Sequence, residues 1–333
     1  MPDFAEAIAW HEAHEVPWSR DIRAVLEGGW FEPPPWNEVI GETAPRGGPA
    51  GMILVDGEVL ARWGDTARVD VTFSVAKTFL ALVAGLAWDR GMLELDRPLG
   101  FPEPQNAPIT WRMLLQNTSE WEGTLWGKSD VIDRNRDLSS EGLNRLKGQP
   151  RPLKQPGTHW EYNDVRVNRL ALSLAELWRR PLPEVLAEHI MGPIGASSTW
   201  RWRGYRNSVV EIDGRPVESV SGGSHWGGGL FISTEDLARV GELVRGDGGG
   251  LLSPEWLALM RQPCALNPSY GFLLWLNGAG RYPSAPPGSV FLLGAGGNIV
   301  WIDRERRLTA VVRWIDTARY DGFCARVLAA LGG

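Results

Sequence analysis

A length of 333 residues allows one large domain or two modest ones, with ample core. The mild net charge of −6 gives no basic surface that would indicate binding to nucleic acid or to an anionic membrane. No apolar run reaches the roughly 18 residues that a membrane-spanning helix needs. The two cysteines, Cys264 and Cys324, are too few for a disulfide framework and lack metal-ligand spacing. The N-terminus has neither the basic nor the apolar region of a secretion signal, so we expect a cytoplasmic protein.

The N-terminal part of the chain is predicted to contain helices, a hairpin and a buried helix. Three consecutive prolines, Pro33 to Pro35, preclude a helix in the region between 30 and 51. Asp56 and Gly57 separate two apolar runs and predict a tight hairpin turn. In chain order we expect helices at 4–14 and 19–28, an irregular connector at 30–51, a hairpin at 52–63 and a helix from about 74 to 90.

The rest of the chain changes from helical patterns to strands. After residue 99 the apolar periodicity predicts helices at 110–115, 165–178, 183–189 and 237–244, with a charged surface segment at 137–157. The last part predicts strands at 270–276, 290–293, 299–303 and 308–314 and a closing helix at 321–331. Strands near both ends predict an α+β fold with one antiparallel sheet. We expect its lobe from residues 1–98 and 261–333, and a mostly helical inserted lobe from 99–260.

Ser74 and Lys77 stand three residues apart at the start of the most apolar predicted helix. Residues at this spacing are neighbours on one helix face, so the hydroxyl and the amine can meet. Burial disfavours the charged amine, and a neutral amine could take the proton of the hydroxyl. The pattern alone is short and also fits an ordinary helix start. The chain has few lysines, however, and this one lies where a solvated lysine is rarely placed.

Several stretches in order resemble the serine β-lactamase and penicillin-recognising superfamily, in its class C-like branch. The resemblance extends from about residue 50 to the C-terminus, which is far more specific than any single motif. It also extends to family VIII-type esterases and 6-aminohexanoate-dimer hydrolases, and it implies a β-lactamase/transpeptidase-like fold. The matching stretches are Phe73-Ser-Val-Ala-Lys77, Leu114-Leu-Gln-Asn-Thr-Ser119, Pro156-Gly-Thr-His-Trp-Glu-Tyr-Asn-Asp164, Gly227 to Leu237, and Leu292 to Trp301.

The resemblance implies roles for individual residues. Ser74 would be the nucleophile that becomes acylated, and Lys77 and Tyr162 would together move protons. The oxyanion hole would consist of the backbone N–H groups of Ser74 and Ala295. No cofactor and no metal is implied. The implied partner is a small-molecule ester or amide substrate.

Two departures from the family pattern bear on the chemistry. Asp164 stands where the second motif normally ends in Asn, and an anion there would favour the charged form of Lys77. The third motif usually offers Lys or His, yet no lysine follows Lys154 and no histidine follows His225. In β-lactam and peptidoglycan enzymes this motif helps to bind the substrate carboxylate. Its loss indicates a neutral substrate, or an anion bound elsewhere, and favours esters or unactivated amides over β-lactams.

The remaining assignments concern the pocket. We expect substrate contacts from residues near the motifs, although tryptophans are as often plain core. The glycines around His225 do not follow a strand of a βαβ unit, which excludes a phosphate cradle. His11 and His14 have no third ligand and are expected at the surface. The predicted substrate-binding residues are Gln116, Trp121, Trp126, Asp164, His225, Trp226 and Gly294.

The sequence therefore predicts a serine hydrolase that cleaves a small ester or amide through an acyl-enzyme. A β-lactamase, a D-alanyl-peptidase-like hydrolase or an acyltransferase of the same fold are the alternatives within the enzymes. A non-catalytic acyl-binding or sensor module is the alternative from another class. The presence of Ser74, Lys77 and Tyr162 together counts against it.

Overall fold

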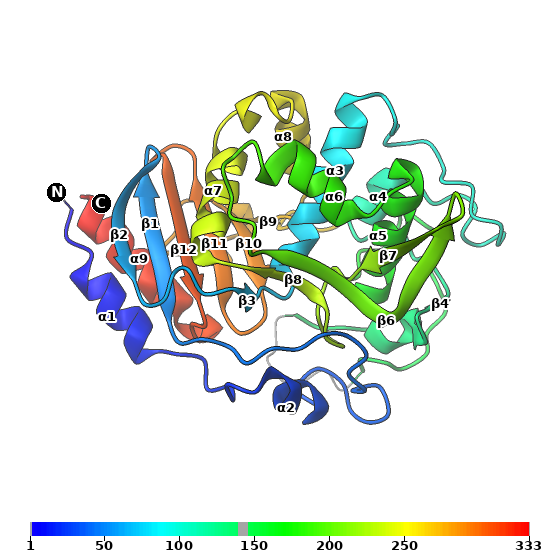
Figure 1. The fold of residues 1–333 in the computed structure, drawn as a ribbon, viewed down its shortest axis with the longest axis horizontal. Helices are drawn as coiled ribbons and strands as arrows, with labels where there is room; N and C mark the ends of the chain where they lie inside the picture. Colours follow the sequence, from blue (N-terminus) through cyan, green and yellow to red (C-terminus); the bar gives the residue numbers. More distant parts are fainter. Residues whose placement is uncertain (1, 139–145, 333) are drawn as a thin grey trace.

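A six-stranded antiparallel sheet lies at the centre of the molecule, a computed structural model that describes residues 2–138 and 146–332 (Figure 1). Its strands come from both ends of the chain, which confirms the predicted arrangement. In spatial order they are β2 (Glu58–Trp63), β1 (Ala50–Val55), β12 (Leu308–Arg313), β11 (Asn298–Asp303), β10 (Val290–Gly294) and β9 (Trp275–Leu276).

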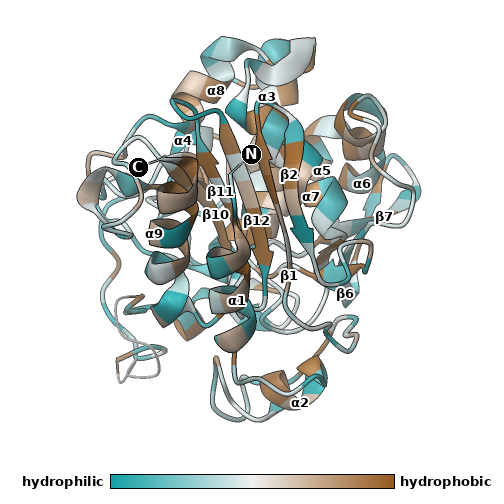
Figure 2. Ribbon diagram, turned by 90° about the vertical axis from the view of Figure 1, so that its left-hand side faces the viewer, coloured by the Kyte–Doolittle hydropathy of each residue, from teal (hydrophilic) through white to brown (hydrophobic). Residues whose placement is uncertain are grey.

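Local sequence explains how these strands form. Asp56 and Gly57 both have positive φ, 56° and 82°, as a two-residue hairpin turn between β1 and β2 requires. Every residue of β11 and β12 is buried, because layers of helices cover both faces of the sheet. This explains their nearly continuous apolar sequences, visible as brown strands in Figure 2.

Helices cover the sheet on both sides. α1 (Ala5–Ala13) and α9 (Tyr320–Leu331) lie together on one face, with the two chain termini near each other (Figure 1). Phe323 of α9 packs its ring 6.1 Å from that of Trp63 on β2. α7 (Thr234–Arg245) packs against β1, β11 and β12 from the other face.

α3 (Val75–Asp89) runs through the interior and carries the Ser74–Lys77 pair at its start. All of its residues from Val75 to Ala87 are buried, which confirms the predicted burial of this helix. The Trp256 ring packs so closely on Gly85 that a Cβ there would lie 2.3 Å from Nε1. The helix is therefore fixed in the core, and the groups at its N-terminus have a rigid support.

The inserted region from 99 to 260 is less helical than predicted. It contains strands β6 (Arg201–Ile212), β7 (Arg215–Val220) and β8 (Gly229–Ile232), which with β3 (Asp70–Val71) form a four-stranded antiparallel sheet in the order β3-β8-β6-β7. A two-stranded ribbon joins β4 (Thr124–Leu125) and β5 (Lys128–Ser129). The other helices are α2 (Ile22–Glu27), α4 (Trp111–Leu115), α5 (Asp164–Trp178), α6 (Leu182–Leu186) and α8 (Pro254–Met260).

Short helical turns complete the chain. They are η1 (Asp130–Asp133), η2 (Ala187–Met191), η3 (Gly248–Gly250), η4 (Asn277–Ala279) and η5 (Thr317–Arg319). The predicted strand at 270–276 is regular only at β9, and its other residues form turns. Cys264 and Cys324 are buried and unpaired. Over the described residues, the structure has no helix with the length and apolarity needed to cross a membrane.

The prediction of a mobile surface segment at 137–157 is wrong for part of it, and residues 139–145 lie outside the described chain. Lys147 donates a 2.6 Å hydrogen bond to the buried Glu32. Arg151 pairs with Glu120 at 2.6 Å and with Glu161 at 2.8 Å. Charged side chains of this segment therefore point inward to buried acids, which a local sequence pattern does not reveal.

Candidate active site

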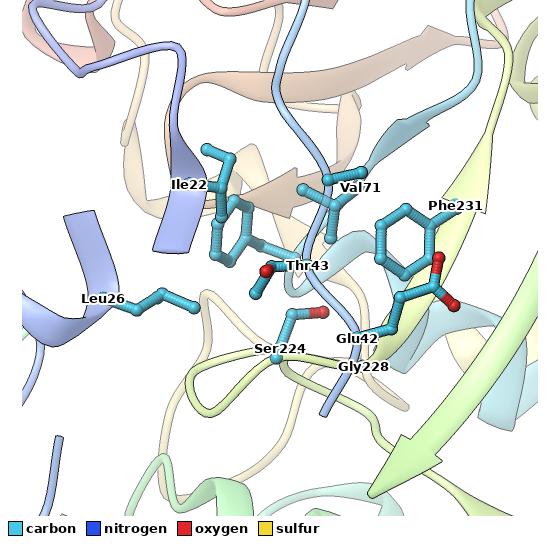
Figure 3. A pocket seen from close by; sticks show the side chains of 11 residues that line it. Ile22, Leu26, Glu42, Thr43, Val71, Ser224, Gly228 and Phe231 are labelled. Atoms are coloured by element: carbon cyan, nitrogen blue, oxygen red, sulfur yellow. The ribbon is translucent and has the colours of Figure 1, made fainter. Parts of the chain in front are cut away.

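Ser74 lies at the N-terminus of α3, after a residue with a strained backbone. Phe73 has φ 51°, in the left-handed region that L-residues rarely adopt. Its buried ring packs against Trp18 at 5.6 Å and Phe31 at 5.9 Å, and these contacts hold the conformation. Phe73 also lines a narrow apolar pocket with Ile22, Leu26, Val71 and Phe231, which leaves no room for a water molecule (Figure 3). Ser74 itself lines a different cavity, described below.

Lys77 contacts Ser74 directly. Its Nζ donates a 2.9 Å hydrogen bond to Ser74 Oγ and a 3.2 Å hydrogen bond to the carbonyl oxygen of Gly222. The same ammonium forms an ion pair with Asp164, and both side chains are 1% exposed. Burial lowers the pKa of Lys77, but the Asp164 carboxylate outweighs it, so the pKa is raised above its ordinary value. The Asp164 carboxylate therefore favours the ammonium form of Lys77 over the neutral amine.

Asp164 is the first residue of α5, where backbone N–H groups and the helix dipole favour a negative charge. Asn163 caps the helix by accepting hydrogen bonds from the N–H groups of Val165 and Arg166. Burial raises the pKa of Asp164, but the adjacent His225, Lys77 and Arg136 outweigh it and hold the pKa well below its usual range. Asp164 is thus a fixed anion beside the Ser74–Lys77 pair.

Asp164 is part of a larger buried ionic network. Its Oδ2 lies 2.8 Å from Arg136 Nη1 and 2.9 Å from His225 Nδ1. Arg136 Nη2 in turn lies 3.2 Å from His225 Nε2. The network continues through Glu32, which is 3.3 Å from His225 Nδ1. Its permanent charges are balanced, with three cations (Lys77, Arg136, Lys147) and three acids (Glu32, Asp133, Asp164).

Glu32, Asp133 and His225 place one ligand atom each within 4.8 Å of one another, a spacing that could hold a metal ion. The Lys147 ammonium, however, lies 2.6 Å from Glu32 Oε1 and 3.1 Å from Asp133 Oδ1. This ammonium already supplies the positive charge that the two carboxylates need. We therefore assign no metal to this cluster.

The Tyr162 side chain borders the same cavity as Ser74. Two cations lie close to its ring, with Lys77 Nζ 4.8 Å and Arg136 Cζ 5.1 Å from the ring centroid. Its ring also packs against Trp275 at 5.7 Å and Tyr270 at 6.1 Å. Aromatic packing and the two cations near its face fix the position of the ring beside Lys77.

The predicted oxyanion strand approaches Ser74 closely. Gly294 ends β10, and a Cβ there would lie 2.0 Å from the carbonyl oxygen of Thr72. Only glycine permits this approach, which brings Gly294 and Ala295 into the cavity lining together with Ser74. The turn is fixed by Asn298, whose side-chain amide donates a 2.8 Å hydrogen bond to the Ala295 carbonyl.

The cavity in front of Ser74 has a volume of about 210 Å³. Its lining combines charged and polar side chains with aromatic and aliphatic ones. Of the predicted site residues, Ser74, Tyr162, His225, Gly294 and Ala295 line it. The other residues of the lining are Arg136, Leu138, Trp275, Arg281, Tyr282, Leu293, Ile299 and Thr317.

Five predicted substrate-binding residues are not part of this lining: Asp164, which is buried in the ion pairs described above, and four others. Gln116 is the C-terminal cap of α4, and the carbonyl of the buried Trp121 accepts a 3.0 Å hydrogen bond from Arg166. Trp226 is fully buried and donates a 2.8 Å hydrogen bond to the Trp36 carbonyl. Trp126, half-buried in a turn, accepts a hydrogen bond at its carbonyl from Asn207. All four therefore have structural contacts away from the cavity.

The glycine-rich loop has a packing role. Gly223 lies so close to the Lys77–Asp164 ion pair that a Cβ there would be 2.6 Å from Asp164 Oδ1 and 3.2 Å from Lys77 Nζ.

The prediction that His11 lies at the surface is wrong. It is buried, accepts a hydrogen bond from Trp63 Nε1 at 2.9 Å and contacts the Arg313 carbonyl at 3.0 Å. His14 is half-buried.

Sequence reasoning missed Arg136 and Arg281, which both line the cavity. Arg136 lies in a charged stretch that resembles solvent-exposed sequence. Asn135 before it has φ 58°, and its N–H donates a 2.8 Å hydrogen bond to the buried Glu161. This turn directs Arg136 inward. Since it depends on a distant acid, no local signal in the sequence could have found it.

Comparisons with known proteins agree with this architecture. The family model described as Beta-lactamase matches residues 41–320. A β-lactamase from Mycobacterium bovis has a similar fold, with a TM-score of 0.62, 21% identity and coverage of 85% of this chain and 94% of that one. EstCE1, described as a hydrolase with promiscuous acyltransferase activity, has a TM-score of 0.61 at 17% identity over 99% of this chain and 98% of its own.

One relative in sequence matches only part of the chain. The candidate penicillin-binding protein PbpX of Bacillus subtilis (strain 168) is 26% identical over 137 residues. This match covers 39% of the chain and about a third, 32%, of that protein. Because the family model extends over most of the sequence and the fold agrees with it, the chain belongs to the Beta-lactamase family of serine hydrolases.

Proposed function

We propose that this protein hydrolyses a small ester or amide through an acyl-enzyme on Ser74. The observation that supports this most directly is the 2.9 Å hydrogen bond from Lys77 Nζ to Ser74 Oγ, at a cavity that Tyr162 also lines. A nucleophile (Ser74), the cation bonded to it (Lys77) and a second titratable group (Tyr162) thus lie together at a cavity that can hold a small molecule.

In the proposed acylation step, Ser74 Oγ attacks the substrate carbonyl carbon. Tyr162 in its deprotonated form accepts the Ser74 proton and then gives it to the departing alcohol or amine. Lys77 remains an ammonium in this step, because Asp164 stabilises its charge. Its hydrogen bond to Ser74 Oγ stabilises the oxygen while the proton leaves.

The negative charge that develops on the substrate oxygen would be held by the N–H groups of Ser74 and Ala295. Gly294 supports this role, since only glycine lets the strand come this close to the residues before Ser74. One such donor is typically worth about 3 to 4 kcal/mol in acyl transfer. In the second step, water attacks the acyl carbon and Tyr162 takes one of its protons. The bond between the acyl carbon and Ser74 Oγ then breaks, and Tyr162 passes that proton to Ser74.

The cavity supports esters and amides over β-lactams as substrates. In the place of the cationic third motif stand Leu293, Gly294 and Ala295, which carry no side-chain charge. An acyltransferase would use the same acyl-enzyme and would differ only in the acceptor. The acceptor is therefore part of the test.

The test uses purified protein with a series of p-nitrophenyl esters, with and without an alcohol acceptor, and with nitrocefin. We expect ester turnover, and a loss of about 10³-fold or more in kcat for Ser74→Ala and for Tyr162→Phe. Each change removes one oxygen atom and keeps the rest of the side chain in place, so the thermal unfolding midpoints should stay close to that of the wild type. Mass spectrometry should detect a fluorophosphonate adduct on Ser74.

The outcomes separate the alternatives. Equal turnover by wild type and Ser74→Ala would contradict the acyl-enzyme mechanism. Fast nitrocefin hydrolysis without esterase activity would identify a β-lactamase. Product that forms mainly with the added alcohol would identify an acyltransferase. Labelling of Ser74 without any turnover would favour a sensor.

A further inference from the structure

Arg281 lies beside aromatic residues of the cavity lining, in the loop between η4 and β10. Its guanidinium carbon lies 4.6 Å from the ring centroid of Trp275 and 5.9 Å from that of Tyr282. Stacking of a planar guanidinium on aromatic rings holds its orientation. The Tyr282 side chain can accept one of its five N–H donors, and the others can donate to a ligand. The residue is exposed at the cavity, whereas the two rings beneath it are buried.

No carboxylate of the described residues pairs with Arg281, in contrast to the other arginine of the cavity. Arg136 is neutralised by Asp164 at 2.8 Å and by Asp133 at 3.5 Å. The described residues of the lining also include no aspartate and no glutamate. Within the described part of the chain, Arg281 is therefore a cavity cation whose charge no carboxylate compensates.

The Trp275 ring, which contacts both residues, sets an upper limit to the distance between Arg281 and Tyr162. The Trp275 ring lies 4.6 Å from the Arg281 guanidinium and 5.7 Å from the Tyr162 ring. The guanidinium and the Tyr162 ring can thus be no farther apart than these two distances together. Ser74 lines the same cavity of about 210 Å³, so one small ligand in it can contact both Arg281 and Ser74.

We propose that Arg281 binds a carboxylate of the substrate, so that the protein acts on esters or amides that carry a carboxylate a few bonds from the scissile carbonyl. This inference rests on the proposed function. It also gives a place for an anion in a cavity whose strand β10 carries no cation. A guanidinium and a carboxylate can form two parallel hydrogen bonds, which makes the recognition geometric as well as electrostatic.

The experiment compares substrates that differ in one negative charge. Mono-p-nitrophenyl adipate and its methyl-capped diester test a carboxylate on the acyl side. 4-Carboxyphenyl butyrate and its methyl ester test one on the departing side. We expect the wild type to prefer the anionic member of one pair by about tenfold or more in kcat/KM, after subtraction of the uncatalysed rates.

Three variants assign this preference to Arg281. Arg281→Gln should reduce the anionic-to-neutral ratio of kcat/KM by about tenfold, and Arg281→Lys should keep part of it. Arg215→Gln is the matched control, because it removes the same charge from an exposed arginine of β7 that does not line the cavity. Its ratio should equal that of the wild type.

No preference in either pair, or a preference that Arg281→Gln leaves intact, would overturn the inference. If no ester is turned over, the proposed function fails, and direct binding still tests Arg281. Calorimetry would then compare adipate with dimethyl adipate on Ser74→Ala and on Ser74→Ala with Arg281→Gln. Adipate binding about tenfold weaker to the double variant supports the carboxylate site, and equal binding contradicts it.

Discussion

His11 and His225 are both buried, but their surroundings shift their protonation in opposite directions. His11 lies between α1 and the central sheet, where its ring contacts the Trp63 indole N–H and the Arg313 carbonyl. Burial lowers the pKa of His11 to about 4, against the raising effect of the Arg313 carbonyl. Burial and the nearby Arg136 also lower the pKa of His225. The carboxylates of Asp164 and Glu32 have a larger effect in the opposite direction, so the pKa is raised.

The comparison teaches that burial alone does not decide the charge state of a side chain in this protein. At His11, neutral dipoles surround the ring and the uncharged form is favoured. Around His225, fixed carboxylates make positive charge favourable, and the same carboxylates keep Lys77 an ammonium. The electrostatics of the cavity therefore depend on acids supplied by other segments more than on the depth of the site.

The largest expected effect follows from removing the shared anion. Asp164→Asn keeps the shape of the side chain but leaves Lys77, Arg136 and His225 without their common carboxylate. Breaking a buried ion pair in this way typically costs about 3 to 5 kcal/mol of unfolding free energy. Urea unfolding at pH 7 would measure it. The variant would also make His225 resemble His11, because the main cause of its raised pKa is gone.

The same variant tests the charge on Lys77. Without Asp164 its pKa falls, so the alkaline limb of the pH profile of kcat/KM should move to lower pH if the ammonium is the active form. Higher activity near neutral pH, with the acid limb displaced downward, would instead identify the neutral amine as the base. Asp96→Asn is the matched control, since that exposed acid pairs only with Arg112 and should change stability by about 1 kcal/mol or less.

A slightly smaller effect is expected at His11. Its folded pKa of about 4 lies below the ordinary value of 6.5, so the native state binds fewer protons than the unfolded state. The stability from this group is present above pH 6.5 and is lost as the pH falls toward 4, by about 3 kcal/mol. His11→Gln should flatten the unfolding free energy between pH 6.5 and 4. An unchanged slope in His11→Gln would refute the assignment.

The smallest expected effect is at His225, and it has the opposite sign. Because its folded pKa is raised, its contribution to stability is fully present below the unfolded pKa of about 6.5 and is lost as the pH rises through the folded value. The difference in unfolding free energy between wild type and His225→Asn should therefore be larger at pH 6 than at pH 9. A difference that grows with pH would show that His225 is buried as a neutral ring like His11.

Sequence alone could predict the parts of the site that depend on local geometry. Ser74 and Lys77 meet because they are three residues apart on one helix, and the apolar run around them required burial. The partners Glu32, Asp133 and Lys147 could not be predicted, since each reaches the network through packing of a segment that has no regular pattern of its own. Contacts between segments that are far apart in the chain produce no periodic pattern of apolar residues in the sequence.

The missed hairpin of β6 and β7 did have a signal. Asp213 and Gly214 stand between two runs of alternating apolar residues, and both have positive φ in the structure, 53° and 72°. An Asp-Gly pair in this context is a strong indication of a two-residue hairpin turn. The prediction of a mostly helical lobe from 99 to 260 did not use this signal, and the local sequence favoured strands.

The glycine at position 223 limits how this site can change over evolution or in directed libraries. Any side chain there would meet the Asp164 carboxylate and the Lys77 ammonium before it met solvent. Single substitutions at Gly223 would thus appear intolerant in a screen even though Gly223 itself does not line the cavity. A path to a different acid at position 164 requires a change in this loop at the same time, so the two positions should be diversified as one unit.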